Sequence, residues 1–132
     1  MTTTLPIHTY LPNASAIAYG CMGLGGSWDN SPISAEDIKL AEGAIEACLE
    51  AEINFFDHAD IYTFGKAEEV FGRILHGRPD LREKIYLQSK GAIRLDQNPP
   101  YYDFSKEWLL TTLDNTLSRL QVDYLDVWLL HS

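Results

Sequence analysis

The sequence predicts an α/β fold in which helices connect the strands of one parallel sheet. Four short apolar runs alternate with segments of helical periodicity, and turn or capping residues separate the two kinds of segment. This alternation is typical of βαβ units. The chain has 132 residues, 45% of them hydrophobic and 22% charged, so we expect residues 1–132 to form a single domain.

The first apolar run, residues 16–22, predicts a strand that leads into the glycine-rich turn at residues 23–26. Ser34 is a good helix N-cap, and the acidic residues after it favour the first turn of a helix. This first helix is predicted by the spacing of Ile38, Ala41, Ala44, Ile45, Cys48 and Leu49. Upstream, residues 5–10 and 11–15, with a Pro-Asn turn signal, predict a short hairpin.

The second strand is predicted over residues 53–57, and the helix that follows it begins near Lys66. Gly77 and Pro79 are expected to end this helix. The apolar residues that it should bury are Val70, Phe71, Ile74 and Leu75.

The third strand is predicted over residues 84–90. The loop at residues 95–104 contains two consecutive prolines, which should exclude both helix and strand. Ser105 is the expected N-cap of a long third helix. Its apolar residues are Trp108, Leu109, Leu113, Leu117 and Leu120. The fourth strand, residues 123–130, ends directly before His131.

The charge of the chain argues against two classes of partner. Ten basic residues stand against 19 acidic ones, a net charge of -9, and no basic stripe is present to bind nucleic acid or an anionic membrane. The N-terminus lacks the features of a signal peptide, and no apolar run is long enough to cross a bilayer, so we expect a cytoplasmic protein. Cys21 and Cys48 have no metal-ligand spacing and are expected to be reduced, buried thiols.

Ionisable side chains stand at the ends of three predicted strands. Asp57 ends the second strand, with Tyr62 in the next loop, while Lys90 ends the third strand and His131 comes directly after the fourth. Functional groups of parallel sheets gather at the carboxyl ends of the strands, so these four should lie near one another. Taken alone, each residue has a simpler structural explanation: Asp57 as a turn former, Tyr62 as a packing aromatic, Lys90 as a solvated charge and His131 as part of a chain end. Their conjunction favours an acid–base site.

The chemistry of such a site can be worked out from its groups. A phenol is a poor proton donor at neutral pH, and a nearby ammonium stabilises its phenolate form, so Lys90 would make Tyr62 a more competent acid. A carboxylate such as Asp57 would keep that ammonium charged and fix its direction. His131 could donate a hydrogen bond to a substrate oxygen.

Four stretches of the sequence resemble the aldo-keto reductase family. FFDHADIYTFGKAEEVFGRIL has the family's Asp, an Ala two residues after it and a Tyr five residues after it. A Gly and a Glu-rich helix start follow. IYLQSKGAI resembles the family's strand that carries the catalytic lysine. LSRLQVDYLDVWLLHS resembles the stretch that ends in the active-site histidine. YGCMGLGG resembles the first strand and its glycine turn. The resemblance covers the chain from about Ala16 onward, and the motifs follow in order.

The resemblance implies a (β/α)8 barrel that uses NADPH to reduce an aldehyde or ketone to an alcohol. It makes Tyr62 the general acid, gives Lys90 and Asp57 the role of tuning it, and gives His131 the role of orienting the substrate carbonyl. His58, which follows Asp57 directly, is expected to point away from the barrel and to be structural, because side chains alternate along a strand.

The resemblance also assigns cofactor contacts. Gly20, Cys21 and Met22 match the place where the family's first strand lies against the nicotinamide ribose, and Asp57 is near the same ribose. Trp28 is a candidate wall of the substrate pocket. A simple tight turn is an equally good explanation for Gly20. Core or loop packing is the better one for Met22 and Trp28.

The sequence departs from the family pattern in its length. A barrel of this kind takes about 250 residues, so 132 residues supply about half of it, the first four strands of a partial domain. In the family the second half carries most of the dinucleotide contacts, so we expect little activity from this chain alone. Its exposed sheet edges should be covered by a second copy, by a complementing C-terminal half or by collapse of the half barrel on itself.

Two other classes of function are open on the sequence alone. One is a non-catalytic assembly or regulatory module that keeps the reductase shape, although such a module has no need for all four ionisable groups. The other is a lyase in which Lys90 forms a Schiff base with the substrate. The aldo-keto reductase motifs make the lyase the weaker alternative.

Overall fold

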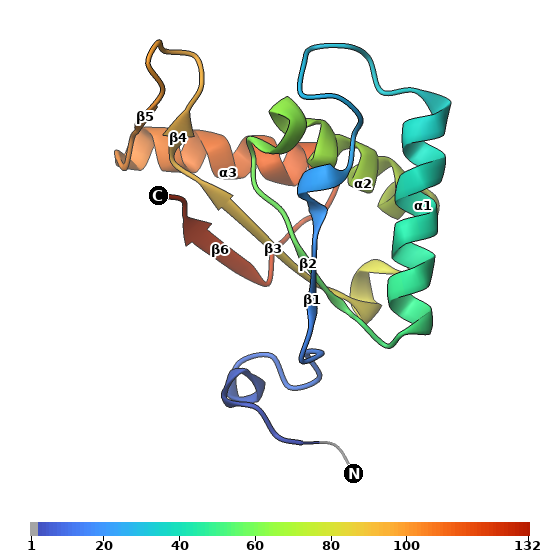
Figure 1. The fold of residues 1–132 in the computed structure, drawn as a ribbon. Helices are drawn as coiled ribbons and strands as arrows, with labels where there is room; N and C mark the ends of the chain where they lie inside the picture. The colour runs from blue at the N-terminus through green and yellow to red at the C-terminus, as the bar shows by residue number, and fades with distance from the viewer. Residues whose placement is uncertain (1–2) are drawn as a thin grey trace.

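The computed structural model describes residues 3–132 and contains one parallel sheet of four strands (Figure 1). The strands are β1 (Ala18–Gly20), β2 (Phe55–Asp57), β3 (Tyr86–Gly91) and β6 (Val127–Leu130). The helices that connect them are α1 (Ala35–Glu50), α2 (Lys66–Gly77) and α3 (Lys106–Leu120). The strands lie side by side in chain order, which is the order of a barrel wall and not of a doubly wound sheet. The α/β prediction is therefore confirmed.

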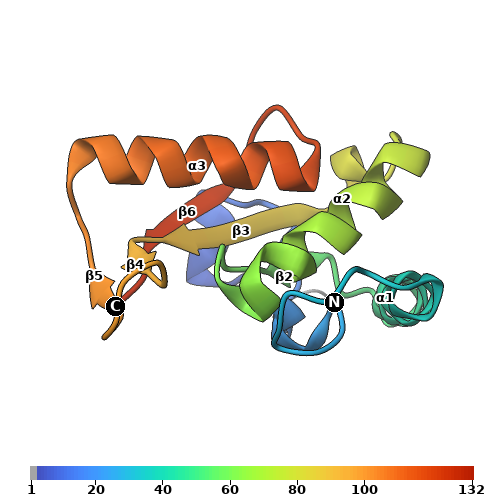
Figure 2. The ribbon, with the colours of Figure 1, turned by 90° about the horizontal axis from the view of Figure 1, so that it is seen from above.

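The helices cover one face of the sheet, which we call the outer face. Seen from above, α3 lies along β3 and β6, and α2 and α1 follow one another around the sheet (Figure 2). Phe56 of β2 and Leu87 of β3 are fully buried in the core on this face. Because side chains alternate along a strand, Asp57 and the residues in register with it point to the opposite, inner face.

The caps that the sequence predicts for α1 and α3 are present. Ser34 Oγ accepts a hydrogen bond from the backbone N–H of Asp37 at 3.1 Å, and the Asp37 carboxylate accepts one from the N–H of Ser34 at 2.8 Å. Ser105 Oγ accepts from the N–H of Trp108 at 3.3 Å. These bonds satisfy backbone donors that would otherwise have no partner in the first turn, and they define where the helices begin. Within residues 3–132, no helix has the length and apolar character needed to cross a membrane.

The buried face of α3 differs from the predicted one. The fully buried positions are Thr112, Thr116 and Leu120, whereas the other predicted apolar residues, Trp108, Leu109, Leu113 and Leu117, are only partly buried. The reason is a close approach of α3 to β3. A Cβ added to Gly91 would lie 2.8 Å from Thr112 Oγ1 and 2.5 Å from the Trp128 ring, so the interface has room for a threonine and not for a leucine.

Glu68, in the first turn of α2, is fully buried between α2, β3 and α3. Its carboxylate accepts hydrogen bonds from Ser89 Oγ at 2.7 Å, Thr116 Oγ1 at 3.2 Å and Arg119 Nε at 2.9 Å. We call these four residues the Glu68 cluster. Ser89 belongs to β3, and Thr116 and Arg119 belong to α3, so the cluster joins α2 and α3 to the sheet. The sequence pattern did not predict this role.

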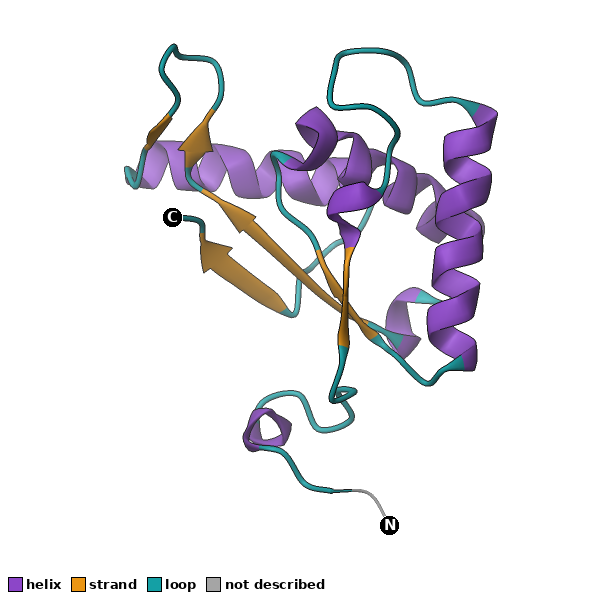
Figure 3. Cartoon of the chain, viewed as in Figure 1, coloured by secondary structure: helices purple, strands orange, loops and turns teal. Residues whose placement is uncertain are grey.

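The predicted N-terminal hairpin is wrong. Residues 5–15 contain a single 3₁₀ turn, η1 (Pro6–Thr9), and no strand (Figure 3). The His8 ring accepts from the N–H of Leu5 at 3.0 Å and lies 2.8 Å from Ala14 O, so local bonds hold the turn. Leu11 and Ala14, three residues apart, face the same way, which a strand would not allow.

We call residues 5–15 the N-terminal plug, because they cover the lower end of the inner face. Leu11 and Ala14 pack there against Phe55, Tyr86 and Val127. The contact buries apolar surface at the amino ends of the strands, on the same face that carries Asp57 at the other end.

Some strand limits also differ from the predicted ones. β1 ends at Gly20 because the next three residues form a 3₁₀ turn, η2 (Cys21–Gly23). β2 begins at residue 55, two residues later than expected. A further turn, η4 (Arg82–Lys84), delays the start of β3 to Tyr86, and the fourth strand begins at Val127 instead of residue 123.

The loop at residues 95–104 is not free of strand, as had been predicted. β5 (Tyr101–Tyr102) pairs antiparallel with β4 (Ile93–Arg94). Both prolines lie in the turn between these strands, where the missing proline N–H removes no ladder bond. Arg94 closes the loop by donating to the carboxylates of Asp96 at 2.7 Å and Asp103 at 3.1 Å.

Candidate active site

Asp57 and Lys90 form an ion pair on the inner face, at the carboxyl ends of β2 and β3. Lys90 Nζ donates to Asp57 Oδ1 at 2.7 Å and to the backbone carbonyl of His58 at 2.8 Å. The exposed fractions of the two side chains are 27% for Asp57 and 12% for Lys90. Two oxygen acceptors compensate the partial burial of the ammonium and fix its direction.

Gln88 is a member of this site that the sequence reasoning missed. It lies opposite Asp57 in the parallel register, and its Nε2 donates to Asp57 Oδ1 at 2.8 Å. Gln88 and Lys90 are two residues apart on β3 and so point to the same face. This spacing could have identified Gln88 from the sequence, because a polar residue two positions before a strand-end lysine is expected to reach the same inner face.

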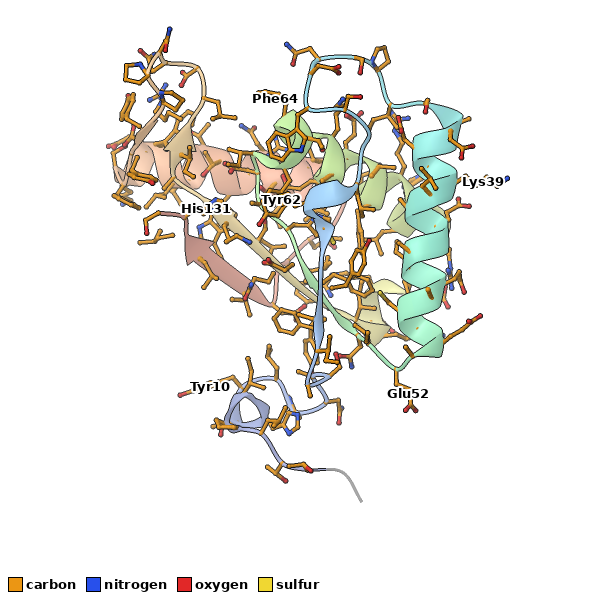
Figure 4. All side chains as sticks on the ribbon, viewed as in Figure 1. Tyr10, Lys39, Glu52, Tyr62, Phe64 and His131 are labelled. Carbon is orange, nitrogen blue, oxygen red and sulfur yellow. The ribbon has the colours of Figure 1, made fainter. Side chains whose placement is uncertain are left out.

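Tyr62 lies in the loop after β2 and turns its ring toward the ion pair. Lys90 Nζ is 5.0 Å from the centroid of the Tyr62 ring, a distance at which the ammonium is attracted to the aromatic face. The rings of Tyr62 and His131 meet edge to face, with centroids 6.4 Å apart and an angle of 88°. Figure 4 shows these two side chains near each other at the upper end of the sheet.

His131 continues the register beyond β6, since its N–H donates to the backbone carbonyl of Gly91 at 2.7 Å. Its Nδ1 is buried without a hydrogen-bond partner among the described residues. Burial lowers the pKa of His131, and the positive charge of Lys90 lowers it further, while Asp57 acts in the opposite direction. The imidazole is therefore neutral at pH 7 and can donate a hydrogen bond without carrying a charge.

The three positions assigned to cofactor contact have different environments. Gly20 is exposed at the end of β1, in register with Asp57, and an added Cβ would have no neighbour within 4 Å. Met22 is 55% exposed. The side chain of Cys21 is in the core, where burial, and then the charge of Asp57, raise the pKa of its thiol well above the usual range. Any cofactor contact of Cys21 would thus involve its backbone, and the roles of all three remain predictions.

His58 points away from the inner face, as predicted. Its ring is fully buried and meets Phe71 of α2 edge to face, with centroids 4.6 Å apart. Neither ring nitrogen has a hydrogen-bond partner in the described part of the chain. Burial lowers the pKa of His58 to about 3, so the ring is a neutral core group. Trp28, the predicted pocket wall, is half exposed and lies edge to face with Phe64 at 5.9 Å.

Asp60 lies behind the Tyr62 loop, at a cavity of about 490 Å³ between that loop and α3. Its Oδ1 atom is buried and has no partner among residues 3–132. Burial, together with the charge of Glu68, raises the pKa of Asp60 to about 7, while Arg119 opposes the shift. The cavity contains none of the four predicted catalytic residues, so we do not assign the acid–base site to it.

The comparisons with known proteins agree on one family. The model of the aldo/keto reductase family matches residues 16–132. A 6-dehydroglucose reductase of Novosphingobium aromaticivorans is 40% identical over 124 residues, which are 89% of this chain and 37% of that protein.

Solved structures give the same result. The aldo-keto reductase AKR11C1 of Bacillus halodurans, in its holo form, superposes with a TM-score of 0.70 at 31% identity, over 89% of this chain and 36% of that one. An aldo-keto reductase of Klebsiella pneumoniae in complex with NADPH superposes with a TM-score of 0.66 at 29% identity, over 89% and 35%. The chain spans little more than a third of the length of these proteins, less than the half that the sequence analysis expected.

Proposed function

Because the chain belongs to the aldo/keto reductase family, we propose that it carries the acid–base site of an oxidoreductase that reduces an aldehyde or a ketone to an alcohol. The observation that carries the proposal is the arrangement around Lys90, whose ammonium is bonded to Asp57 and lies 5.0 Å from the Tyr62 ring. A purely structural role would not require an ion pair, a phenol and a neutral imidazole on one open face.

The roles of the residues follow from their contacts. The Tyr62 hydroxyl donates its proton to the substrate oxygen as the carbonyl carbon gains a hydride, so that the product is an alcohol. The charge of Lys90 stabilises the phenolate left on Tyr62, and Asp57, which itself accepts a hydrogen bond from Gln88, holds Lys90 in place. The neutral His131 donates a hydrogen bond to the same substrate oxygen. Solvent then returns the proton to Tyr62.

We propose NADPH as the cofactor, and it would supply the hydride when bound. Two observations support this choice. The open space at Gly20, beside Asp57, leaves room for a ribose and a nicotinamide ring against the end of β1. The Klebsiella pneumoniae neighbour is a complex with NADPH. Gly20, Met22 and the backbone of Cys21 would then form the near wall of the cofactor site, with Asp57 at the ribose.

We propose that further strands cover the two edges of the sheet. β1 and β6 are the edge strands, and within residues 3–132 each pairs on one side only. Ile17 next to β1 and Leu130 of β6 are exposed apolar residues at these edges. Unpaired edges with apolar side chains favour association. Either a second copy of the chain or a complementing C-terminal half of the barrel would provide the missing strands.

The test begins with a titration of NADPH into the chain, followed by the fluorescence of its three tryptophans, with the mass in solution measured in parallel. The same titration is then repeated with the C-terminal part of a relative added, and reduction of simple aldehydes is assayed. We expect saturable quenching and carbonyl reduction in at least one of the two assemblies, and Tyr62→Phe should abolish reduction while leaving the quenching intact. Absence of NADPH binding in both assemblies would overturn the proposal.

A further inference from the structure

The backbone directly after Tyr62 is left-handed over three residues. Thr63 has φ 47° and ψ 41°, Phe64 has φ 57° and ψ 39°, and Gly65 has φ 90°. Glycine adopts this conformation without strain, but a β-branched residue such as threonine rarely does. A strained backbone persists only where the surrounding structure holds it, so contacts of Thr63 must stabilise this turn.

Those contacts clamp the loop after β2 to the loop after β1. Thr63 is fully buried, and its Oγ1 donates across the two loops to the backbone carbonyl of Leu24 at 2.8 Å. Lys66 Nζ donates to the carbonyl of Ser27 at 2.6 Å. Between these bonds the backbones almost touch, because a Cβ added to Gly25 would lie 2.7 Å from the carbonyl carbon of Lys66.

The left-handed turn separates the directions of two aromatic rings. Tyr62, before the turn, points toward His131, whereas Phe64, within it, lies above and apart (Figure 4). Thr63 Oγ1 is also 2.7 Å from the backbone carbonyl of Tyr62, so its single hydrogen is shared between the carbonyls of Leu24 and Tyr62, and the hydroxyl is in contact with the residue that it would position. If residue 63 left the left-handed region, the peptide plane that follows Tyr62 would rotate and carry the ring with it.

We propose that Thr63 is a positioning residue for Tyr62. Its hydroxyl, bonded to Leu24 O, holds the left-handed turn that keeps the Tyr62 ring beside Lys90 and His131. The importance of this position for catalysis rests on the proposed function, but the positioning itself does not. A residue that only filled the core would affect stability and leave the direction of the Tyr62 ring unchanged.

The experiment measures the direction of the ring by NMR on the chain. In the wild type we expect a nuclear Overhauser effect between the Tyr62 and His131 ring protons and a Cα shift at residue 63 typical of a left-handed residue. Thr63→Val has nearly the same shape but no hydroxyl, and it should weaken the effect by more than half. Thr63→Ser restores the hydroxyl and should restore the effect. Thr111→Val is the matched control, since it removes an exposed hydroxyl bonded to Glu107 O at 2.8 Å on α3.

A second variant keeps the test decisive if Thr63→Val does not fold. Thr63→Ala also lacks the hydroxyl, but without a branched Cβ it is easier to accommodate than valine, and it too should lose the ring-to-ring effect, because the bond to Leu24 O that holds the strained turn is gone. An unchanged effect in either variant, or its absence in the wild type, would overturn the proposal. If the variants lose the effect but no carbonyl is reduced in either assembly, the proposed function is refuted and the role of Thr63 stands.

Discussion

Two carboxylate–cation pairs lie on opposite faces of the same sheet and have opposite environments. On the outer face, Glu68 is fully buried, and both of its oxygens accept hydrogen bonds, one of them from Arg119 Nε, while Arg119 Nη2 forms an ion pair with Glu68 Oε1 at 2.8 Å. On the inner face, Asp57 is 27% exposed, and its bonds from Gln88 and Lys90 both go to Oδ1.

One strand, β3, contributes to both carboxylate sites. Ser89 and Lys90 are consecutive residues of β3, yet one donates to Glu68 and the other to Asp57. A buried carboxylate with hydrogen bonds to both oxygens and no access to solvent is suited to holding elements together. A carboxylate with a free oxygen and access to solvent can change its bonds during a reaction. We therefore assign stability to the outer pair, whereas the inner pair has the environment that the proposed function requires.

Removal of Glu68 is expected to have the largest effect on stability. Glu68→Ala leaves Ser89, Thr116 and Arg119 without their acceptor, and loss of one partner of a buried pair costs about 3–5 kcal/mol of unfolding free energy. Urea denaturation measures the effect. Glu69→Ala is the matched control, since that exposed glutamate only pairs with Arg73 at 3.0 Å and should cost less than about 1 kcal/mol. Equal losses in the two variants would contradict the structural role of Glu68.

A second prediction concerns the loss of folding stability in acid that the buried, neutral ring of His58 should cause. The pKa of His58 is about 3 in the folded chain, against about 6.5 when unfolded. The unfolded state therefore binds a proton first as the pH falls, and stability should decrease from about pH 6.5 to about pH 3. On this basis the chain loses on the order of 3 kcal/mol between pH 7 and pH 4 through His58.

His58→Phe should remove most of this acid sensitivity, because the new ring cannot bind a proton and can keep the contact with Phe71. The exposed His76 provides the control, and His76→Phe should leave the pH dependence unchanged. Unfolding curves at several pH values decide the matter. If His58→Phe and the wild type lost stability in parallel on acidification, another group would be responsible.

Asp60 should show the opposite dependence and a smaller effect. Its pKa is about 7 when folded and about 3.9 when unfolded, so the stability linked to its protonated form is lost as the pH rises between these values. After a discount for partial exposure, Asp60→Asn should be about 1 kcal/mol more stable than the wild type at pH 8 and similar to it at pH 4. Asp114→Asn, on the exposed side of α3, is the control. A gain that did not vary with pH would exclude this explanation.

The smallest effect on stability is expected from the inner pair itself. Lys90→Met leaves Asp57 with its bond from Gln88 and with contact to water, so the unfolding free energy should change by less than about 1 kcal/mol. Carbonyl reduction by an assembled barrel should instead fall by about 10²-fold or more. Glu68→Ala, measured beside it, should show the reverse order of the two effects. A large loss of stability in Lys90→Met would erase the distinction between the faces.

The sequence was sufficient where the signal is local. The caps at Ser34 and Ser105 depend on contacts within four residues, and both were predicted. The end of the second strand at Asp57 was also predicted, and the end of the third strand was predicted at Lys90, one residue before its observed end at Gly91. A polar residue after an apolar run is recognised without knowledge of the rest of the chain. A parallel sheet then brings these ends together without further information.

The sequence was insufficient where distant segments meet. Glu68 looked like an ordinary acidic residue in a first turn, because its partners Thr116 and Arg119 are about 50 positions away. The leucines of α3 formed a convincing apolar stripe, but the close approach at Gly91 selected the threonines for burial. Residues 5–15 have a turn signal that suits a hairpin as well as a 3₁₀ turn. Tertiary packing made the choice in each case.

The N-terminal plug has a practical consequence for handling the protein. It packs on Phe55 at the lower end of the inner face, while His131 and Tyr62 lie at the upper end (Figure 4). Two hydrogen bonds hold the plug there. Asn54 Nδ2 donates to Asn13 O at 2.7 Å, and the N–H of Ser15 donates to Asn54 Oδ1 at 2.8 Å. A solid support or fluorescent label attached ahead of the plug would therefore leave the upper end free, whereas attachment beyond Leu130 would crowd it.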